Sequence, residues 1–599
     1  MNKPDVVGVF IGLESATYEY IATIISPYNI NFTLNIGDFL LIENLNHEIV
    51  SRVTEYRPTG ELTSFMGQKW LGDISNDLDA IGLDIKEKKI RYNVRIKILG
   101  TLKEKEFTPG LTKIPHITSK VYKPDYEQLK NIIDAANKDQ INGTEIGKLW
   151  IDKSIGIKFN VSDLNSRRSF IFARAGYGKS NLMKLIASSW PKGEGGLIIF
   201  DPEGEYAIID KNNRHGIMDA KPALLITNRK ENPELKNVYR TMKLNFKTLE
   251  PQFIIPLIIN PMKYETIFYQ KLMSMEKSQW EQLVDLIQNK KWSADLPEVA
   301  KIITRNEDDD GQSLKPVLNN LVAPIMKLHD PDSHLIDIIT KAMKTENVVI
   351  VDISLLDNQT ALQLSSLILQ FIFNHNQTHF TDENTDLIKA TFVMEEAQSV
   401  IGQNTNYSTF VELAKEGRKY NLGGIFITQQ PGSIPQDILS QGDNFFIFHL
   451  LSRGDLESLK RSNAHFSDDI LTQILSEPTP GKCYMWTSHQ PFVLPVMIDD
   501  FDIIGASNNS INIQAKENLL DPILTEVRKD DETISEIIKL QQEVEKENPE
   551  DEKGNKTKKL FNKLTNEQKE YLRKNGQIQS NNVGMEFAVK TKFYNNLLK

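Results

Sequence analysis

A glycine-rich segment between an apolar strand and a helix constrains this chain more than any other feature. The predicted strand Ser169 to Phe172 is followed by Ala173-Arg174-Ala175-Gly176-Tyr177-Gly178-Lys179-Ser180 and then by a helix-like stretch that reaches Ser189. Backbone N–H groups of such a loop and of the helix N-terminus face an anion, and glycines allow close approach. The pattern predicts a phosphate-binding loop at the end of a buried strand in an α/β domain.

The polar residues of this loop have expected contacts with a nucleotide. Lys179 is expected to reach the β- and γ-phosphates, and the hydroxyl of Ser180 to bind Mg²⁺. Ala173 stands where the motif usually has its first glycine, so the usual pattern is not strictly met. The sequence therefore predicts ATP and Mg²⁺ as cofactors. The predicted nucleotide-binding residues are Ala175, Gly176, Tyr177, Gly178, Lys179, Ser180 and Asn181.

A second apolar strand ends in two acids. Ala390 to Met394 runs into Glu395 and Glu396. Because parallel strands present their carboxyl ends at one edge of a sheet, these acids are expected near the phosphate loop. We assign Glu395 to the Mg²⁺ shell and Glu396 to polarising the attacking water. The alternative is an acidic surface pair at a strand end.

Polar residues also flank a third apolar strand, Gly423 to Thr428. Gln429 follows it and is a candidate sensor of the γ-phosphate, the alternative being an amide that faces solvent. Arg418 precedes it and is a candidate arginine finger for a neighbouring site, because a guanidinium stabilises the charge of phosphoryl transfer. The alternative is a surface or salt-bridged arginine. Arg167 and Arg168 are further candidates for the finger.

The distribution of apolar runs predicts several domains. Short runs alternate with helix-like segments from about residue 147 to 500, which favours a parallel sheet covered by helices. Short strands with turn signals before residue 115 favour a small β-barrel or sandwich. The predicted domains are an N-terminal β-barrel at 1–115, a linker at 116–146, the ATPase core at 147–228 and 345–500, a helical insertion at 229–344 and a C-terminal extension at 501–599.

Two segments outside the predicted sheet have an unusual composition, one rich in proline and one rich in charged residues. Pro109, Pro115 and Pro124 discourage helix and favour a linker. Asp530 to Lys574 is dense in charged residues, and is either a solvated, partly disordered tail or a helical arm that braces a neighbouring subunit. Four apolar residues could form one face of that arm before Asn548-Pro549-Glu550-Asp551 breaks it; they are Ile534, Ile537, Ile538 and Val544.

Composition excludes some classes of protein. Of the 599 residues, 40% are hydrophobic and 25% charged, as in ordinary globular chains. With one cysteine, Cys483, the chain has no internal disulfide framework or Cys-rich zinc site, which fits the cytoplasm. No apolar window approaches the roughly 18 residues of a membrane span. The net charge of −10 counts against a simple nucleic-acid binder but not against a ring with a locally basic channel.

Further motifs resemble the HerA family of ATPases. Asp201-Pro202-Glu203-Gly204-Glu205-Tyr206 resembles the family's Asp-x-x-Gly-Glu-Tyr element. Glu416-Gly417-Arg418-Lys419-Tyr420 and the strand after it look like its Glu-Gly-Arg-Lys segment and sensor strand. Val7-Gly8-Val9-Phe10 with Glu14-Ser15-Ala16-Thr17 is similar to the start of its N-terminal barrel. Glu395-Glu396-Ala397-Gln398 departs from the commoner Asp/Glu-Glu-Ala-His, which leaves the role of Gln398 open.

The resemblance covers roughly residues 1 to 500 and implies more than the motifs show. It implies a RecA-like P-loop NTPase core in a homo-hexameric ring, with ATP sites between subunits and Arg418 acting in trans. It implies double-stranded DNA in the channel. It also implies a partner, either a nuclease for end resection in DNA repair, or a nuclease or NAD-hydrolase effector in antiviral defence.

Alternatives to a DNA-translocating motor stay open. One is a scaffold that assembles and activates an effector, with ATP as the switch and the N-terminal barrel as its docking face. Another is a conjugative coupling or secretion ATPase, against which the lack of a membrane segment argues. Lys290-Lys291-Trp292 could grip DNA phosphates in a motor, or could be a solvated helix end.

Overall fold

The computed structural model describes most of the chain. The described residues are 6–14, 19–28, 34–73, 86, 88–103, 106–111, 113–140, 142–208, 214–230, 236–305, 311–381, 387–402, 408–503, 517–547, 551–574, 577–580, 586–591 and 593–594. Ser15, Ala16 and Thr17 of the barrel motif lie outside them.

The chain divides into two compact units. The first unit comprises Met1–Val161, Phe170–Leu182 and Gln429–Asp500, and the second comprises Ser162–Ser169, Met183–Thr428 and Phe501–Lys599. The chain therefore passes from the second unit to the first within one strand and returns within the helix that follows.

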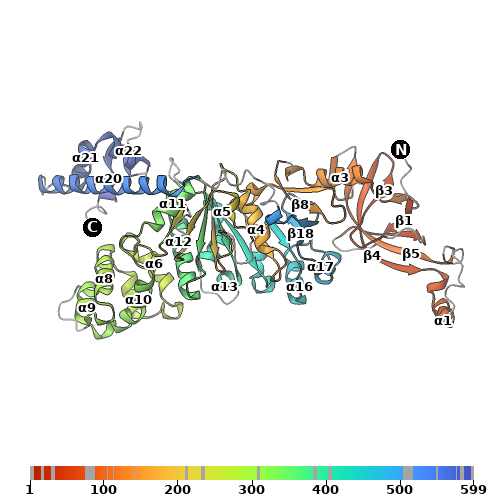
Figure 1. Ribbon diagram of the computed structural model, residues 1–599, viewed down its shortest axis with the longest axis horizontal. Helices are drawn as coiled ribbons and strands as arrows, with labels where there is room; N and C mark the ends of the chain where they lie inside the picture. The colour runs from red at the N-terminus through yellow and green to blue at the C-terminus, as the bar shows by residue number, and fades with distance from the viewer. Residues whose placement is uncertain are drawn as a thin grey trace. The chain divides into compact units, whose positions relative to one another are not determined.

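The first unit begins with an antiparallel β-barrel (Figure 1). Its strands lie in the order β2-β1-β7-β3-β4-β5-β6, and β2 also pairs with β5, so that six strands close and β6 extends the edge. The strands are β1 (Val6–Leu13), β2 (Ile21–Pro27), β3 (Phe39–Asn44), β4 (His47–Thr59), β5 (Arg91–Lys103), β6 (Glu106–Pro109) and β7 (Lys120–Tyr122). Buried aliphatic side chains from these strands, with Phe10, fill its interior. This confirms the predicted barrel.

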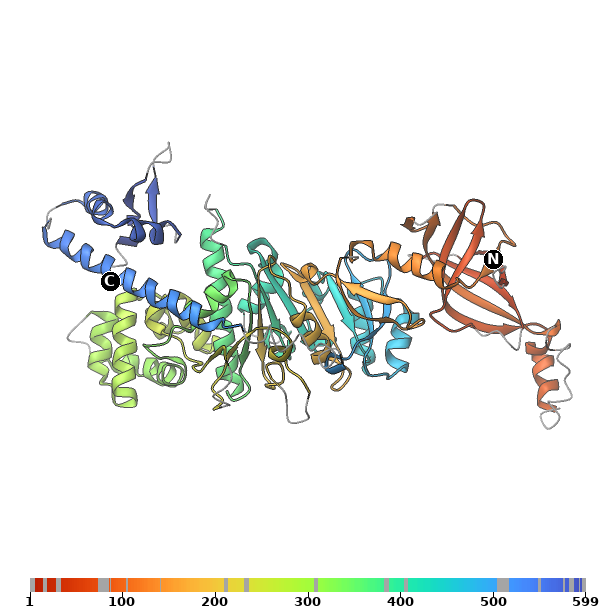
Figure 2. The same ribbon diagram turned by 45° about the horizontal axis from the view of Figure 1, so that its top comes forward.

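The hairpin of β4 and β5 extends to a short helix, α1 (Phe65–Asp73), at its far end (Figures 1 and 2). None of its residues is buried, and Phe65 and Met66 are 82% and 71% exposed. A helix this short has little stability of its own in water, so the hairpin supports it.

The expected linker at 116–146 contains a strand and a helix, so the expectation that Pro109, Pro115 and Pro124 discourage helix there is wrong. Helix α3 (Tyr126–Ala136) begins after Pro124, where the side chains of Asp125 and Gln128 form a capping box. Its buried apolar face includes Ile132 and Ile133. Proline before the N-cap does not disturb a helix, because it lies outside the hydrogen-bonded turns.

A buried ion pair joins the barrel to the α/β part of the first unit. Arg52 of β4 contacts Asp469 of α17 (Asp468–Ser476) at 2.7 Å, and both side chains are 3% exposed. Burial raises the pKa of Asp469, but the charge of Arg52 and a hydrogen bond from Ser467 outweigh it and hold that pKa below its usual value. The pair therefore stabilises the fold above the ordinary pKa of an aspartate, about 4, and this contribution is lost as the pH falls.

Replacing Arg52 with methionine is expected to destabilise the first unit by about 3–5 kcal/mol, because Asp469 remains buried without its partner. The double replacement Arg52→Met with Asp469→Leu is expected to recover most of this loss, since no buried charge is left. Urea denaturation followed by tryptophan fluorescence measures both. A double variant as unstable as Arg52→Met would contradict the assignment.

The first unit also holds part of a mixed sheet, in the order β10-β17-β18-β19-β8-β9. These strands are β10 (Arg168–Phe172), β17 (Asn444–Ile447), β18 (Lys482–Thr487), β19 (Leu494–Ile498), β8 (Thr144–Leu149) and β9 (Gly156–Phe159). From β17 onward every pair is antiparallel. The sequence predicted the parallel part of the core but not this extension.

The second unit contains six parallel strands in the order β13-β12-β14-β11-β15-β16. They are β13 (Val238–Tyr239), β12 (Leu224–Ile226), β14 (Val348–Asp352), β11 (Gly196–Asp201), β15 (Ala390–Met394) and β16 (Leu422–Thr428). The last four are buried along their whole length, as short apolar strands covered on both faces should be. The N–H of Gly424 in β16 donates to the carbonyl of Arg167, so the start of β10 lies beside β16 in this unit.

Helices cover this sheet and fill the sequence between its strands. Those between β13 and β14 are α6 (Pro251–Ile258), α7 (Ile267–Met273), α8 (Lys277–Lys290), α9 (Leu296–Thr304), α10 (Lys315–Leu328) and α11 (Leu335–Lys344). Helices α7 and α8 are separate, because Glu276 starts α8 with a capping box to Gln279. Helix α12 (Asn358–His379) follows β14.

The C-terminal extension forms helices and a hairpin over its described residues, so the disordered-tail alternative is wrong there. Its elements are α20 (Leu520–Glu547), α21 (Lys553–Lys563), α22 (Asn566–Lys574), β20 (Ile578–Ser580) and β21 (Glu586–Val589). Ile537 and Val544 of α20 pack with Leu560 and Val589 in a small core. Lys341 of α11 contacts Asp530 of α20 at 2.6 Å. Among all helices in the described ranges, none is long and apolar enough to cross a membrane.

Candidate nucleotide site

The predicted phosphate loop lies in the first unit, between β10 and α4 (Lys179–Ser188). Gly176 and Gly178 adopt φ of +82° and +110°, which side chains other than hydrogen strongly disfavour. A Cβ on Gly176 would meet nothing within 4 Å, so the loop is open on that side. Lys179 and Ser180 begin α4, where N–H groups point away from the helix toward a bound anion.

Neighbouring segments of the first unit fix the shape of this loop. The N–H of Arg174 donates to the carbonyl of His449, and the N–H of Gly481 donates to the carbonyl of Tyr177. The ring of Tyr177 lies 4.8 Å from that of His449. The amide of Asn181 donates to the carbonyl of Asp499 at 2.8 Å. The loop is thus held in shape by the chain itself.

Ala173 meets the requirements of its position. Its side chain is wholly buried, and its φ is not positive. Neither the backbone conformation nor the space therefore demands the glycine that usually stands there.

The two predicted acids lie in the second unit, directly after β15. Both side chains are half-buried. The phenol of Tyr206 donates to Oε1 of Glu395 at 2.5 Å. Complete burial, followed by the nearby charge of Glu395, raises the pKa of Tyr206, so this phenol keeps its proton at physiological pH. Tyr206 was noticed in the sequence only as part of a family motif, and no local signal paired it with Glu395.

The carboxylate of Asp201 holds the turn that contains Tyr206 in its conformation. It accepts hydrogen bonds from the N–H groups of Glu203, Gly204 and Tyr206 at 2.7–3.2 Å. Gly204 adopts φ of +72°, which closes the turn. Burial raises the pKa of Asp201 to about 6 despite these bonds. The carboxylate of Asp201 therefore fixes the turn after β11, and this turn places the phenol of Tyr206 against Glu395.

The remaining candidates occupy distinct places in the fold. Arg418 lies in a short 3₁₀ helix, Gly417–Tyr420, and its side chain is exposed. Gln429 directly follows β16 and is half-buried. Arg167 and Arg168 lie at the start of β10, at the end of that strand away from the phosphate loop.

Comparison with known proteins places these motifs in a family. Residues 144–372 match the family model described as the central domain of helicase HerA. The DNA double-strand break repair helicase HerA of Saccharolobus solfataricus is 23% identical over 459 residues, which cover 74% of this chain and 83% of that protein. That of Pyrococcus furiosus is 22% identical over 522 residues, covering 78% and 87%. The chain is therefore similar to the HerA family over most of its length. The same comparisons support an ATPase.

Solved structures that align with this chain have lower sequence identity than these HerA relatives. VirB4 of Thermoanaerobacter pseudethanolicus aligns with a TM-score of 0.39 and 16% identity, covering 60% of this chain and 96% of that one. The conjugative coupling protein TrwB aligns with a TM-score of 0.40 and 10% identity, covering 61% and 90%.

The phosphate loop of the first unit offers backbone N–H groups, a lysine and a hydroxyl, which fit the phosphates of a nucleotide. The acids of the second unit offer oxygen ligands of the kind that Mg²⁺ prefers. In the described ranges, no cluster of three or more His, Cys, Asp or Glu side chains could hold a metal by itself. Mg²⁺ bound through one or two carboxylates commonly completes its shell with phosphates and water.

Replacing Tyr206 with phenylalanine is expected to raise the Mg²⁺ concentration for half-maximal ATPase activity about tenfold, because the bond that orients Glu395 is lost. A titration of ATPase rate against Mg²⁺ measures the change. Tyr420→Phe is the matched control, since the ring of that buried tyrosine packs on Phe373 and Phe380. Equal Mg²⁺ curves for Tyr206→Phe and wild type would contradict the role given to Glu395.

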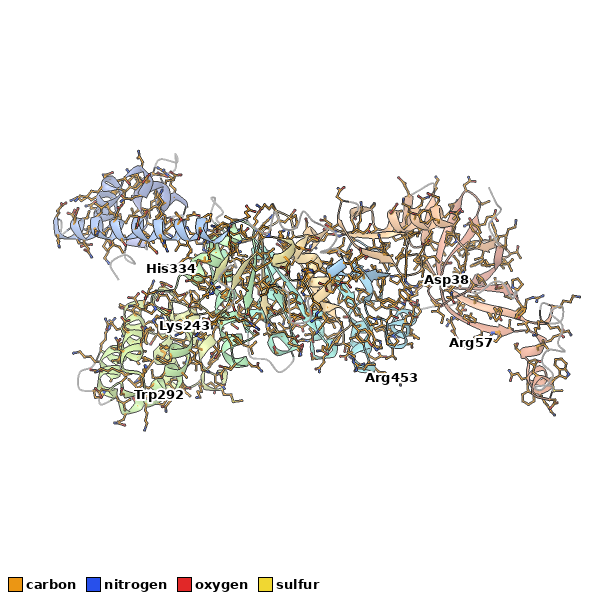
Figure 3. All side chains as sticks on the ribbon, in the orientation of Figure 1. Asp38, Arg57, Lys243, Trp292, His334 and Arg453 are labelled. Atoms are coloured by element: carbon orange, nitrogen blue, oxygen red, sulfur yellow. The ribbon has the colours of Figure 1, made fainter. Side chains whose placement is uncertain are left out.

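Two other features lie outside these motifs. Lys290 is paired with Glu298 at 2.6 Å, and Trp292, labelled in Figure 3, is 63% exposed, as in the solvated-helix-end alternative.

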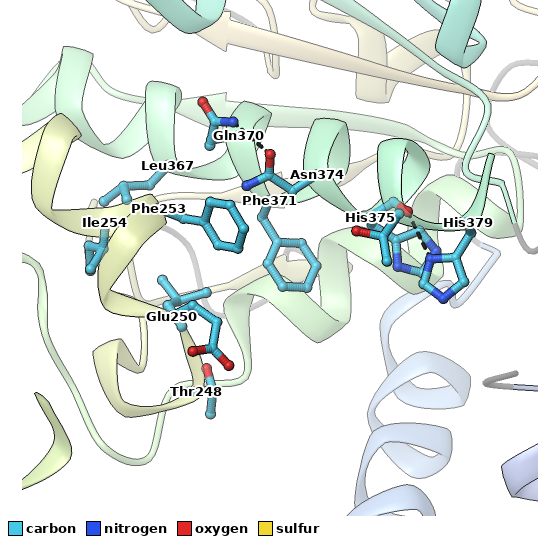
Figure 4. Close-up of a pocket in the computed structure, with 12 residues that line it drawn as sticks. Thr248, Glu250, Phe253, Ile254, Leu367, Gln370, Phe371, Asn374, His375 and His379 are labelled. Carbon is cyan, nitrogen blue, oxygen red and sulfur yellow. Dashed lines mark hydrogen bonds between the residues drawn. The ribbon is translucent and has the colours of Figure 1, made fainter. Parts of the chain in front are cut away.

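A cavity of about 200 Å³ lies between α6 and α12 (Figure 4). Phe253, Phe371 and Asn374 are among its lining residues, and it contains none of the predicted site residues.

Proposed function

We propose that this chain is a HerA-family ring motor that couples ATP hydrolysis to translocation of double-stranded DNA. The observation that carries the proposal is the preformed phosphate loop between β10 and α4 in a chain whose acids follow a second core strand. Relatives that align over most of both chains are DNA double-strand break repair helicases. Local cations that grip the phosphate backbone would suffice for movement without base recognition.

Each candidate residue has a proposed role in hydrolysis. Loop residues 175–181 bind the phosphates of ATP, with Lys179 on the β- and γ-phosphates. Ser180 and Glu395 bind Mg²⁺. Glu396 orients and polarises the attacking water, and Gln429 responds to the γ-phosphate.

The proposed assembly is a homo-hexamer with one site at each subunit interface. Arg418 is exposed in a short helical turn, as a residue that acts on a neighbouring subunit must be. The proposed partner is a nuclease or an NAD-hydrolase effector. The barrel, which has its own core, is a separate module on which such a protein could dock.

Steady-state ATPase rates with and without linear double-stranded DNA test the proposal, on protein whose mass is measured in the same buffer. A hexamer whose ATPase is strongly stimulated by DNA supports the motor. A hexamer with ATPase activity that is indifferent to DNA supports the scaffold instead, in which ATP controls an effector.

A further inference from the structure

Gln398 connects two elements of the second unit that carry proposed catalytic functions. Its Nε2 donates to Oε2 of Glu396 at 2.6 Å. Its Oε1 accepts the hydroxyl proton of Thr428, the last residue of β16, at 2.5 Å. A single side chain therefore bridges the carboxylate after β15 and the end of the adjacent strand.

The chemistry of the partners fixes the orientation of this amide. A carboxylate can only accept hydrogen bonds, so the NH₂ group of Gln398 must face Glu396. A flipped amide would bring two acceptor oxygens together. The carbonyl oxygen is then left to face Thr428, whose side chain is completely buried. Both ends of the amide are thus satisfied in only one orientation.

Backbone hydrogen bonds hold the turn on either side of this bridge. Glu396 adopts φ of +47°, an uncommon conformation for a residue with a side chain. The N–H of Ala397 donates to the carbonyl of Ile427, and the N–H of Ser399 donates to the carbonyl of Glu396. These bonds hold the turn to β16 but do not set the rotamer of Glu396.

We propose that Gln398 is a positioning residue that holds the Glu396 carboxylate in the orientation needed to polarise water. Through Thr428 it also makes this orientation depend on the end of β16, the strand that leads to Gln429. This inference rests on the proposed role of Glu396 in ATP hydrolysis. It assigns a function to the position at which this chain departs from the family's more usual histidine.

Removing the bridge is expected to slow the chemical step without weakening nucleotide binding. Gln398→Ala loses both hydrogen bonds, and kcat is expected to fall about 10- to 100-fold with KM unchanged, by analogy with other residues that orient a reacting group. Thr428→Val keeps the volume and the bond to Glu396 but removes the hydroxyl, and is expected to lower kcat less. Because the two residues act through one chain of bonds, the double variant should be no slower than Gln398→Ala.

Histidine at this position provides a test that a merely structural role would fail. Neutral imidazole donates from one nitrogen and accepts at the other, as the amide does. Gln398→His is therefore expected to retain most of the activity at pH 8. Protonated imidazole has no acceptor and pairs with Glu396, so kcat should fall as the pH drops through the histidine pKa, near 6.5. The ratio of the variant's kcat to the wild-type kcat should therefore fall over this range, because the wild-type enzyme has no imidazole at this position.

The experiment measures kcat, KM and unfolding midpoint between pH 5.5 and 8.5 for wild type, Gln398→Ala, Gln398→His, Thr428→Val and the double variant of Gln398→Ala with Thr428→Val. Gln363→Ala is the matched control, because that glutamine of α12 makes a buried hydrogen bond to the carbonyl of Ile258 far from the acids in sequence. Its midpoint is expected to fall while its kcat stays at the wild-type value.

The outcomes separate this inference from the proposed function. Wild-type protein that hydrolyses no ATP refutes the proposed function itself. Active wild type, with a Gln398→Ala variant of unchanged kcat or a Gln398→His variant that has the wild-type pH profile, overturns the positioning role. A fall in kcat accompanied by an equal loss of nucleotide affinity also overturns it, because the variant then damages the site as a whole.

Discussion

Replacing Lys179 with alanine is expected to reduce ATP hydrolysis by a factor of about 10³ or more, to the background of the assay. The lysine stands at the start of α4, directly after Gly178, whose left-handed conformation turns the loop toward the helix. Its ammonium group is expected to neutralise the β- and γ-phosphates as charge develops there. A steady-state assay of phosphate release at saturating ATP and Mg²⁺ measures the loss.

The matched control is Lys192→Ala, which removes an exposed lysine shortly after the same helix. This variant is expected to hydrolyse ATP at the wild-type rate. Both variants should unfold at the wild-type midpoint, because neither side chain belongs to the apolar core. Normal turnover by Lys179→Ala would refute the assignment of the phosphate loop.

The parallel strands of the core were predictable because a strand buried on both faces is a short, continuous run of apolar residues in the sequence. The predicted strands at 390–394 and 423–428 correspond to β15 and β16. β4 was not predicted, because one of its buried positions is a charged residue, Arg52. Its ion-pair partner, Asp469, is 417 residues away in the sequence. The antiparallel extension was missed for a similar reason. Strand direction depends on the long-range partner, and β18 and β19 show no local sign of it.

Within the candidate site, the residues of the motifs were predictable but the contacts that orient them were not. The sequence predicts a phosphate loop at Gly176, Gly178 and Lys179, because the backbone geometry of such a loop requires those residue types at that spacing. The bond between Tyr206 and Glu395 joins residues 189 positions apart. Gln398 could be singled out in the sequence only as a departure from a motif, and its link to Thr428 depends on the pairing of β15 with β16.

An arginine that completes a neighbour's site differs from an ordinary surface arginine in one testable respect. Arg418→Ala and Glu396→Gln are each expected to lower ATPase activity strongly, by about 10³- to 10⁵-fold for the arginine. If Arg418 acts in trans, the two defects fall on opposite sides of an interface. A mixed ring then contains some interfaces at which an Arg418→Ala subunit supplies the intact acid and a Glu396→Gln subunit supplies the intact arginine.

Mixing these two inactive variants in equal amounts is therefore expected to restore ATPase activity, up to about a quarter of the wild-type rate if the interfaces act independently. Mass measurement of differently tagged subunits verifies that mixed rings form. The control mixes Glu396→Gln with Lys179→Ala. Both defects then lie on the same side of every interface, so no intact site can arise. Rescue in the first mixture and none in the second requires that the arginine and the acid come from different subunits. Verified mixed rings without rescue would instead leave Arg418 as a residue of its own subunit's surface.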